Sequence, residues 1–372
     1  MFDSRPVTEA DAILGVRPRY VAEPTTIAEA AAVLRAAHEH GFSVVARGAG
    51  TRLHWGGVPR SADLVLDTRR LDRLVEHAAG DLVVTVEAGM LMADLQALLA
   101  GQGQQLALDS PLPGSTVGGT LATAAAGPRR LLYGTARDLL IGVTAVRADG
   151  AIVKSGGKVV KNVAGYDLGK LYTGSFGTLG LIVSASFRLH PVPATKAYVR
   201  GTTRTLLREV QALLHSDVVP SAIEINGTDE IVVLLEGSAV GRRAEQVVGL
   251  LGAGAQISEE APPWWGSYPK GEVLLEVTAK PTDLPEVLAL SGSRVRGCAN
   301  GVWLIGTFAA SAPDLVARLR ARWPAVVRYA PRSVREQLDV WGPSPGLPLM
   351  RRVKDQFDPG HRLSPGRFIG GI

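Results

Sequence analysis

Five glycine-rich segments in the first half of the chain and in its C-terminal tail constrain the fold more than any other feature. Between them lie short apolar strands and helices, which predict an α+β fold with glycine-rich corners. Glycine lets backbone N–H groups approach a ligand, and successive N–H groups form a concavity for anions. The segments are RGAGT (47–51), PLPGSTVGGTLAT (111–123), YGTARDLLIG (133–142), KNVAGYDLGKLYTGSFGTLGLI (161–182) and FDPGHRLSPGR (357–367).

The first segment predicts a phosphate-binding loop, although a plain tight turn remains the alternative for this stretch alone. Gly48 and Gly50 precede Thr51-Arg52-Leu53, so the third glycine of a G-x-G-x-x-G fingerprint is missing. The chain also contains no P-loop motif and no HExxH. These absences argue against a Rossmann dinucleotide site, a P-loop site and a zinc-protease helix.

Composition places the chain among ordinary globular proteins. A net charge of +5 over 372 residues, with no basic run interleaved with aromatics, does not support nucleic-acid binding. The lone Cys298 and an N-terminus without a secretory layout predict a cytoplasmic location. No apolar stretch reaches the roughly 18 residues of a membrane span, so we expect any membrane contact to be peripheral, at the inner face and through partners.

From about residue 196 the glycine clusters give way to short strands and amphipathic helices in the order βαββαβ, twice over. Two ferredoxin-like halves sharing one sheet explain this pattern. The predicted domains are a cofactor domain over residues 1–195, a smaller α/β cap domain over 196–340, and a tail over 341–372 that returns to the first domain.

The five segments, in this order, resemble the FAD-binding domain of the vanillyl-alcohol oxidase and p-cresol methylhydroxylase (PCMH) superfamily. Through KNVAGYDL and GTLGLI the chain is similar to the FAD-binding (E) subunit of glycolate oxidase, also called glycolate dehydrogenase. The resemblance covers about half of the chain, residues 17–193 and the tail. It implies a PCMH-type FAD-binding domain in which the bare backbone of the first two segments wraps the FAD pyrophosphate.

The resemblance also implies which residues bind FAD. For Arg47, a charged contact with the cofactor and a surface ion pair remain equal alternatives; Tyr166 is equally plausible as an ordinary buried aromatic. The predicted cofactor-binding residues are Arg47, Gly48, Ala49, Gly50, Thr51, Pro111, Gly114, Ser115, Thr116, Gly118, Gly119, Thr120, Gly165, Tyr166, Asp167, Gly180 and Ile182.

The chain departs from the family pattern at several positions. Thr51 stands where some members attach FAD covalently through a histidine, so we expect non-covalent FAD; His54, three residues later, is expected to be structural or exposed. Phe176 replaces a glutamate of the family, and Ser364 replaces the asparagine of a C-terminal Asn-Pro-Gly. These changes affect side-chain roles and leave backbone contacts intact.

The positions of the histidines distinguish between the functional hypotheses. Catalytic relatives that oxidise D-2-hydroxy acids carry a metal-binding histidine pair in the second domain, whereas this chain has no histidine between residues 216 and 360. We therefore predict no metal site and leave the catalytic residues unassigned. The resulting hypothesis is an FAD subunit of a complex that acts on a small 2-hydroxy acid with a larger FAD subunit and an iron–sulphur subunit. The alternatives are a stand-alone FAD-dependent alcohol or 2-hydroxy-acid dehydrogenase and a non-catalytic FAD-binding assembly subunit.

Overall fold

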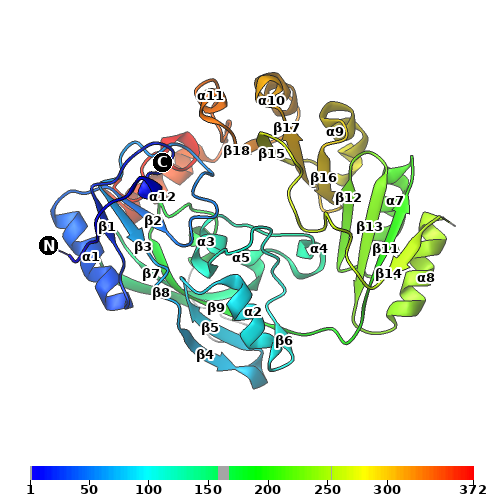
Figure 1. Ribbon diagram of the computed structural model, residues 1–372, viewed down its shortest axis with the longest axis horizontal. Coiled ribbons are helices and arrows are strands. Elements are labelled where there is room, and N and C mark those ends of the chain that lie inside the picture. The colour runs from blue at the N-terminus through cyan, green and yellow to red at the C-terminus, as the bar shows by residue number, and fades with distance from the viewer. Residues whose placement is uncertain (1, 158–166, 253) are drawn as a thin grey trace. The chain divides into compact units, whose positions relative to one another are not determined.

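The computed structural model describes residues 2–157, 167–252 and 254–372, which form two compact units (Figure 1). Unit 1 contains Met1–Ala125, Thr135–Pro191 and Pro343–Ile372. Unit 2 contains Ala126–Gly134 and Val192–Gly342. Among the described residues, none of the helices has both the length and the apolar character needed to cross a bilayer.

Unit 1 begins with a three-stranded parallel sheet in the order β1-β3-β2. Its strands are β1 (Tyr20–Ala22), β2 (Val44–Arg47) and β3 (Leu64–Asp67), with helix α1 (Ile27–Glu39) between β1 and β2. The helix starts where the Thr26 hydroxyl accepts a hydrogen bond from the Glu29 N–H, as expected of an N-cap. Its buried stripe, Ala30, Ala31, Val33, Leu34 and Ala37, packs into the same core as β3. This packing fixes β2, whose C-terminal end carries the first glycine loop.

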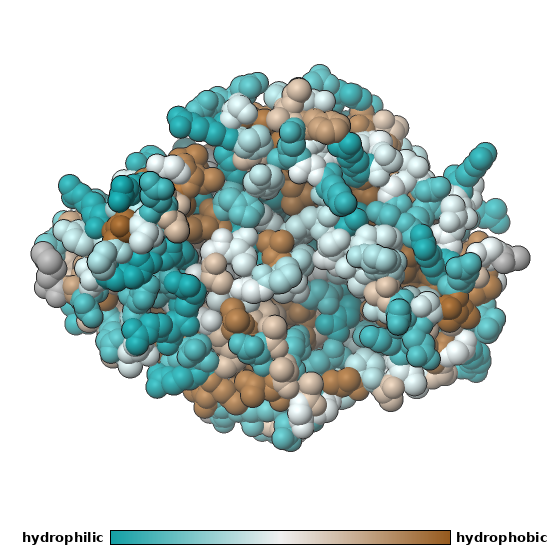
Figure 2. Space-filling view, in the orientation of Figure 1, coloured by the Kyte–Doolittle hydropathy of each residue, from teal (hydrophilic) through white to brown (hydrophobic). Residues whose placement is uncertain are grey.

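A second, five-stranded antiparallel sheet in unit 1 has the order β4-β5-β9-β7-β8. Its strands are β4 (Leu74–Ala78), β5 (Val83–Glu87), β7 (Leu140–Val146), β8 (Ile152–Gly156) and β9 (Leu181–Arg188). Strands β7 and β8 form the hairpin expected from Asp149-Gly150, and Gly150 takes the left-handed φ of 81°. The edge strand β4 leaves Leu74 and Val75 41% and 56% exposed, and apolar surface gathers over this region in Figure 2.

Shorter elements connect and cover the two sheets of unit 1. Strands β6 (Gln104–Gln105) and β10 (His190–Pro191) form a small antiparallel pair. The helices are α2 (Met92–Ala100), α3 (Val117–Ala122), α5 (Ala136–Leu139), α6 (Gly169–Tyr172) and α12 (Leu347–Phe357), with 3-10 turns at Glu9–Asp11, Ala79–Asp81 and Ile369–Gly371. The tail joins the parallel sheet directly, because Leu363 bridges Val44 and Ser364 N–H donates to the Val44 carbonyl over 2.7 Å.

Unit 2 contains one eight-stranded antiparallel sheet in the order β14-β11-β13-β12-β16-β17-β15-β18. The first half is β11 (Lys196–Thr202), α7 (Leu206–Leu214), β12 (Ala222–Asn226), β13 (Glu230–Glu236), α8 (Val240–Leu251) and β14 (Gln256–Ser258). The second half is β15 (Val273–Thr278), α9 (Leu284–Ser291), β16 (Val295–Cys298), β17 (Val302–Thr307), α10 (Ala312–Arg320) and β18 (Ala325–Tyr329). The prediction of two βαββαβ halves sharing a sheet is confirmed, and the halves join where β12 pairs with β16.

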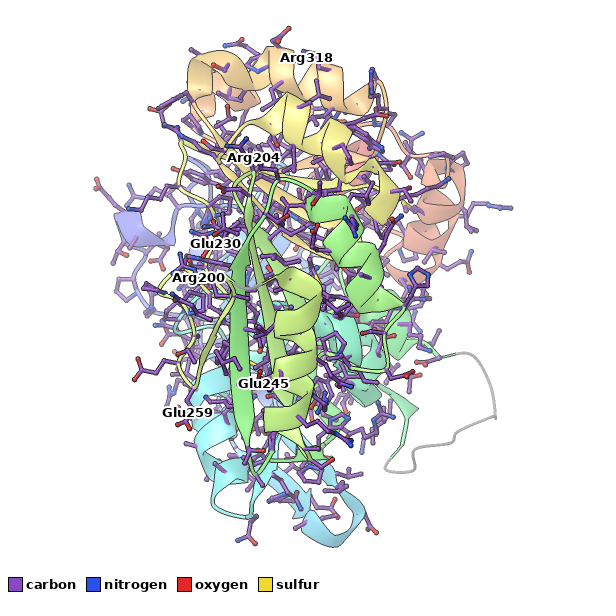
Figure 3. All side chains as sticks on the ribbon, turned by 90° about the vertical axis from the view of Figure 1, so that its right-hand side faces the viewer. Arg200, Arg204, Glu230, Glu245, Glu259 and Arg318 are labelled. Atoms are coloured by element: carbon purple, nitrogen blue, oxygen red, sulfur yellow. The ribbon has the colours of Figure 1, made fainter. Side chains whose placement is uncertain are left out.

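One buried cluster between the sheet of unit 2 and its helices α7 to α10 contains side chains of all four helices, with Trp303 among the largest. On the opposite face, Trp264 and Trp265 pack against Tyr198 and Val232. Figure 3 shows Arg200 and Glu230 near each other on the sheet, where the Arg200 Nε to Glu230 Oε1 distance is 2.5 Å. Trp264 Nε1 donates to the same oxygen over 3.2 Å, so these tryptophans are anchored to the sheet.

Residues 126–134 differ from the uninterrupted first domain predicted over residues 1–195, because they belong to unit 2. Leu131 of helix α4 (Arg130–Tyr133) packs against the large core of unit 2. The Cys298 thiol donates to the Pro128 carbonyl over 3.8 Å, and Arg129 lies 3.8 Å from the Glu236 carboxylate.

Short elements also follow strands of the sheet in unit 2. They are the 3-10 turns Pro281–Asp283 and Ala309–Ser311 and the helix α11 (Arg332–Arg335).

Candidate cofactor-binding site

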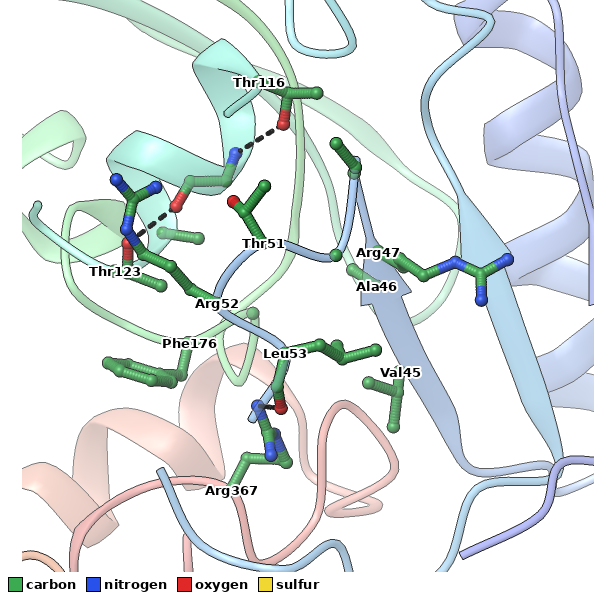
Figure 4. A pocket seen from close by; sticks show the side chains of 16 residues that line it. Val45, Ala46, Arg47, Thr51, Arg52, Leu53, Thr116, Thr123, Phe176 and Arg367 are labelled. Atoms are coloured by element: carbon green, nitrogen blue, oxygen red, sulfur yellow. Dashed lines mark hydrogen bonds between the residues drawn. The ribbon is translucent and has the colours of Figure 1, made fainter. Parts of the chain in front are cut away.

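Four of the five glycine-rich segments contribute to a pocket of about 80 Å³ (Figure 4), and residues 133–142 are absent from its lining. Four parts of unit 1 supply its walls: the end of β2 with the loop after it, helix α3 with its N-cap, the turn before β9, and the tail. The lining residues are Val45, Ala46, Arg47, Gly48, Ala49, Gly50, Thr51, Arg52, Leu53, Thr116, Gly119, Ala122, Thr123, Phe176, Gly177 and Arg367.

Gly48 allows the first loop to approach helix α3. A Cβ at this position would overlap the Thr116 hydroxyl oxygen and lie 3.2 Å from Thr116 Cβ. The Thr116 side chain is held in place because its hydroxyl accepts the Gly119 N–H over 3.2 Å, which caps α3. The absence of a side chain at Gly48 therefore serves the packing of the loop on α3, independently of any ligand.

Gly50 shapes the loop, and Thr51 connects it to the second glycine segment. Gly50 has a φ of 77°, the left-handed region that favours glycine, and its carbonyl accepts the Leu53 N–H over 3.0 Å. The hydroxyls of Thr51 and Ser115 lie 3.2 Å apart, and Ser115 also donates to the Leu112 carbonyl over 2.6 Å. The contact between Thr51 and Ser115 thus joins the first loop to the second glycine segment.

The guanidinium of Arg47 points away from the pocket, as Figure 4 shows, although the backbone of this residue lines it. Its Nη1 donates to Asp11 over 2.9 Å and its Nη2 to Asp67 over 2.8 Å. The hydrogen bond from Arg5 is the largest influence on Asp11 and holds the pKa of that carboxyl far below its usual range, against the effect of burial. A closed ring of alternating charges results, made of Arg5, Asp11, Arg47, Asp67, Arg69 and Glu23. The Arg47 side chain therefore fixes the end of β2 through ion pairs.

Tail residues hold two walls of the pocket in place. Arg367 donates Nη1 to the Gly57 carbonyl over 2.9 Å and Nη2 to the Leu53 carbonyl over 2.8 Å. The ammonium of Lys354 is 1% exposed and donates to Asp358, to the Thr178 carbonyl and to the Leu363 carbonyl over 2.6, 2.7 and 3.0 Å. One buried cation thus joins the turn before β9 to the tail.

Phe176, which replaces the family's glutamate, lines the pocket in an unusual conformation. Its φ is 54°, in the left-handed region that is costly for an aromatic residue. The Phe176 N–H donates to the Ala122 carbonyl over 2.9 Å, and its ring stacks on Phe368 with centroids 6.0 Å apart. Contacts with α3 and with the tail therefore hold the strained turn.

Seven predicted cofactor residues line the pocket: Arg47, Gly48, Ala49, Gly50, Thr51, Thr116 and Gly119. Other predicted residues lie outside its lining for identifiable reasons: a Cβ at Gly118 would come within 2.8 Å of Ala88 Cβ, and one at Gly180 within 2.9 Å of Tyr172 Cε1, so both glycines serve packing. The rest outside the lining are Pro111, Gly114, Ser115, Thr120, Asp167 and Ile182, while Gly165 and Tyr166 fall outside the described residues.

Sequence reasoning missed several residues that line the pocket, above all Arg52, Thr123 and Arg367. Helical spacing was a usable signal for Thr123, because positions 116, 119 and 123 fall on one face of a helix. The Thr123 hydroxyl donates to the Gly119 carbonyl over 2.8 Å. No local signal marks Arg367, which reaches the loop from 314 positions beyond Leu53.

The donor set of this pocket suits an anionic group. Arg52, threonine side chains and glycine backbone are among the described residues that line it, and no aspartate or glutamate is among them. Exposed backbone and guanidinium groups are typical ligands of phosphate oxygens. The pocket, at about 80 Å³, has room for a small anionic group such as the diphosphate of a dinucleotide. The rest of such a ligand must extend beyond the pocket.

Comparisons with known proteins agree with this fit. Residues 18–156 match the FAD binding domain family. The chain is 32% identical over 228 residues to the glycolate oxidase subunit GlcD of Bacillus subtilis, covering 60% of this chain and 48% of that protein. It is 40% identical over 174 residues to a D-lactate dehydrogenase of Archaeoglobus fulgidus, covering 46% of this chain and 38% of that protein. The chain thus spans about half the length, or less, of these curated relatives.

Among solved structures, the chain resembles alkyldihydroxyacetonephosphate synthase with a TM-score of 0.72. The likeness covers 94% of this chain and 76% of that one at 17% sequence identity, so it shows the fold alone. A second crystal form of the same protein gives a TM-score of 0.71. Taken with the family match, the likeness confirms the predicted fold class: this chain carries a PCMH-type FAD-binding domain, and its cofactor is FAD.

Proposed function

We propose that this chain is the FAD-binding subunit of a glycolate oxidase-type complex. Its relatives include a glycolate oxidase subunit, D-lactate dehydrogenases and a D-2-hydroxyglutarate dehydrogenase, and the compounds in these names are all 2-hydroxy acids. Bound FAD supplies hydride acceptance and electron transfer. The observation that carries the proposal is the basic, glycine-lined pocket of unit 1 in a domain of the FAD-binding type.

Within this proposal, the backbone of residues 47–51 binds the diphosphate together with Thr116 and Gly119. The other predicted residues, including Gly165 and Tyr166, remain proposed contacts of the more distant parts of the cofactor. Thr51 has no nucleophilic ring nitrogen, so FAD is held without a covalent bond at this position. We also propose that unit 1 is the cofactor domain and unit 2 the cap.

The proposed partners are a larger FAD subunit and an iron–sulphur subunit, in the cytoplasm or at the inner face of the membrane. The support comes from the histidine distribution in this chain, since residues 216–360 contain none of the imidazole ligands expected beside a 2-hydroxy acid. Electrons therefore pass between the substrate and the acceptor through partner subunits. The substrate class, a small D-2-hydroxy acid, belongs to the whole complex.

The test is an anaerobic titration of the FAD-loaded chain with glycolate and D-lactate, alone and together with its co-purified partner subunits. We expect the flavin absorption band to stay oxidised when the chain is alone and to bleach when the partners are present. Rapid bleaching of the isolated chain would instead establish a stand-alone dehydrogenase. No bleaching under either condition would overturn the 2-hydroxy-acid assignment.

A Gly48→Asp variant separates the electron-transfer role from an assembly role. The substitution would place a carboxylate in the loop proposed to hold the diphosphate, so in complexes that still assemble we expect FAD binding by this chain and the activity of the complex to be lost together. Full complex activity without flavin in this subunit would show that the chain acts as an assembly subunit.

A further inference from the structure

Arg52 occupies a position that the FAD assignment above does not use. It follows Thr51 in the first glycine loop, it lines the pocket, and it is only 5% exposed. Figure 4 shows its side chain extending from the loop towards the side of the pocket formed by α3 and Thr123. Its Nη2 donates to the Ser110 hydroxyl over 3.2 Å, and its guanidinium lies 5.6 Å from the centroid of the Trp55 ring. These contacts hold the guanidinium in place at the pocket wall.

The three arginines of the pocket differ in where their guanidinium groups lie. Arg47 turns its guanidinium away from the pocket and donates to the carboxylates of Asp11 and Asp67. Arg367 donates both Nη groups to loop carbonyls, so its side chain holds the loop to the tail. Arg52 instead extends towards α3 and Thr123, on the other side of the loop from the Arg47 side chain (Figure 4). Its guanidinium is therefore the candidate for an anion on that side of the pocket.

A guanidinium in such a wall matches a phosphate in charge and in shape. Its planar fork of N–H donors binds phosphate oxygens in a bidentate way, and charge-assisted hydrogen bonds are about twice as strong as neutral ones. The described lining of the pocket contains no carboxylate that would repel the phosphate oxygens.

We propose that Arg52 is the charged ligand of the FAD diphosphate. The sequence had offered Arg47 for this role, with an ion pair of Arg47 as the equal alternative. This inference rests on the proposal that the pocket holds the diphosphate. It predicts that FAD affinity depends on salt largely through Arg52, because a cation that binds phosphate is weakened by ionic screening.

The experiment measures the Kd of FAD for the FAD-free full chain at low and high KCl in four proteins: parent, Arg52→Gln, Arg52→Lys and Arg70→Gln. Arg70 is exposed and absent from the pocket lining, so its variant controls for net charge. We expect Arg52→Gln to bind FAD about ten- to a hundredfold more weakly, the range of a charge-assisted hydrogen bond, and to lose most of the salt dependence. Arg52→Lys should retain the salt dependence with part of the affinity, and Arg70→Gln should match the parent.

Several results would overturn the inference. Arg52→Gln binding as tightly as the parent, with the same salt dependence, would show that Arg52 does not contact the diphosphate. Equal losses in Arg52→Gln and Arg52→Lys, with the parental salt dependence in both, would show a packing role. If the parent itself fails to bind FAD, the pocket assignment fails with it. Arg52→Met, which keeps an unbranched stem beside Trp55, gives the same comparison if Arg52→Gln does not fold.

Discussion

The close approach of the first glycine loop to helix α3 makes Gly48→Ala a sharp test of how the pocket is built. The backbone at Gly48 does not have a left-handed φ, so alanine meets no conformational penalty there. Its Cβ would overlap Thr116 Oγ1 and lie 3.2 Å from both Cβ and Cγ2 of Thr116. Relief requires either a Thr116 rotation that breaks the cap of α3 or a shift of the backbone.

Both routes have known costs. Loss of an N-cap costs about 0.5–2 kcal/mol, and overpacking of a tight contact costs about 1–3 kcal/mol. We therefore expect Gly48→Ala to lower the free energy of unfolding by about 1–3 kcal/mol. Urea denaturation of the FAD-free protein measures this loss without a contribution from ligand binding.

A double-mutant cycle with Thr116→Ala assigns the loss to this contact. Thr116→Ala alone should cost about 0.5–2 kcal/mol as a lost cap, and adding Gly48→Ala to it should cost little more, because the overlapping hydroxyl is gone. Gly80→Ala is the matched control, since its Cβ would meet no atom within 4 Å. Additive losses in the double variant, or a loss in Gly80→Ala equal to that in Gly48→Ala, would refute the reasoning.

Two further predictions concern buried ionisable groups. The pKa of Asp11 is lowered chiefly by its hydrogen bond from Arg5, so its contribution to stability is complete above the unfolded carboxyl pKa of about 3.9 and is lost as the pH falls below it. Asp11→Asn should therefore lower the free energy of unfolding at pH 7 by about 3–5 kcal/mol. Urea denaturation should show the difference in unfolding free energy between variant and parent becoming smaller below about pH 4. A difference that stays constant down to about pH 2 would exclude this ion pair as the cause. Burial raises the pKa of the Cys298 thiol far above its usual range. Ellman's reagent should therefore detect almost no reactive thiol in the folded chain and one thiol after denaturation. Rapid labelling of the native protein would contradict the burial of Cys298.

Local sequence patterns predicted much of the secondary structure and the topology of unit 2. The alternation of β11 and the amphipathic spacing of α7 are local signals, and both recur in the second half of the unit. The Asp149-Gly150 turn likewise specifies its own hairpin, β7 to β8. These features depend on neighbours within a few residues, which a single sequence displays directly.

Long-range contacts explain what sequence patterns left out. Gly48 is required by Thr116, and Gly118 by Ala88, yet nothing near either glycine in the sequence distinguishes a packing requirement from a ligand requirement. The partners of Arg47 are Asp11 and Asp67, 36 and 20 positions away. Such pairings depend on the tertiary fold and not on local periodicity.

Segment 126–134 shows the same limit for domain boundaries. It follows the glycine-rich segment 111–123 and runs into the segment 133–142, and the prediction placed all of them in one uninterrupted domain. Leu131, however, packs into the core of unit 2, and the Pro128 carbonyl accepts the Cys298 thiol from 170 positions away. The amino-acid composition of the segment does not indicate either contact.

Whether this chain binds FAD without a covalent bond can be decided by an absorption spectrum of the purified, FAD-reconstituted chain, followed by acid denaturation and filtration. We expect a bound flavin spectrum and free FAD in the filtrate, because the pocket offers the cofactor arginine, hydroxyl and backbone donors and Thr51 offers no covalent attachment. A chain that takes up no flavin, or a flavin that stays with the precipitated protein, would contradict this expectation.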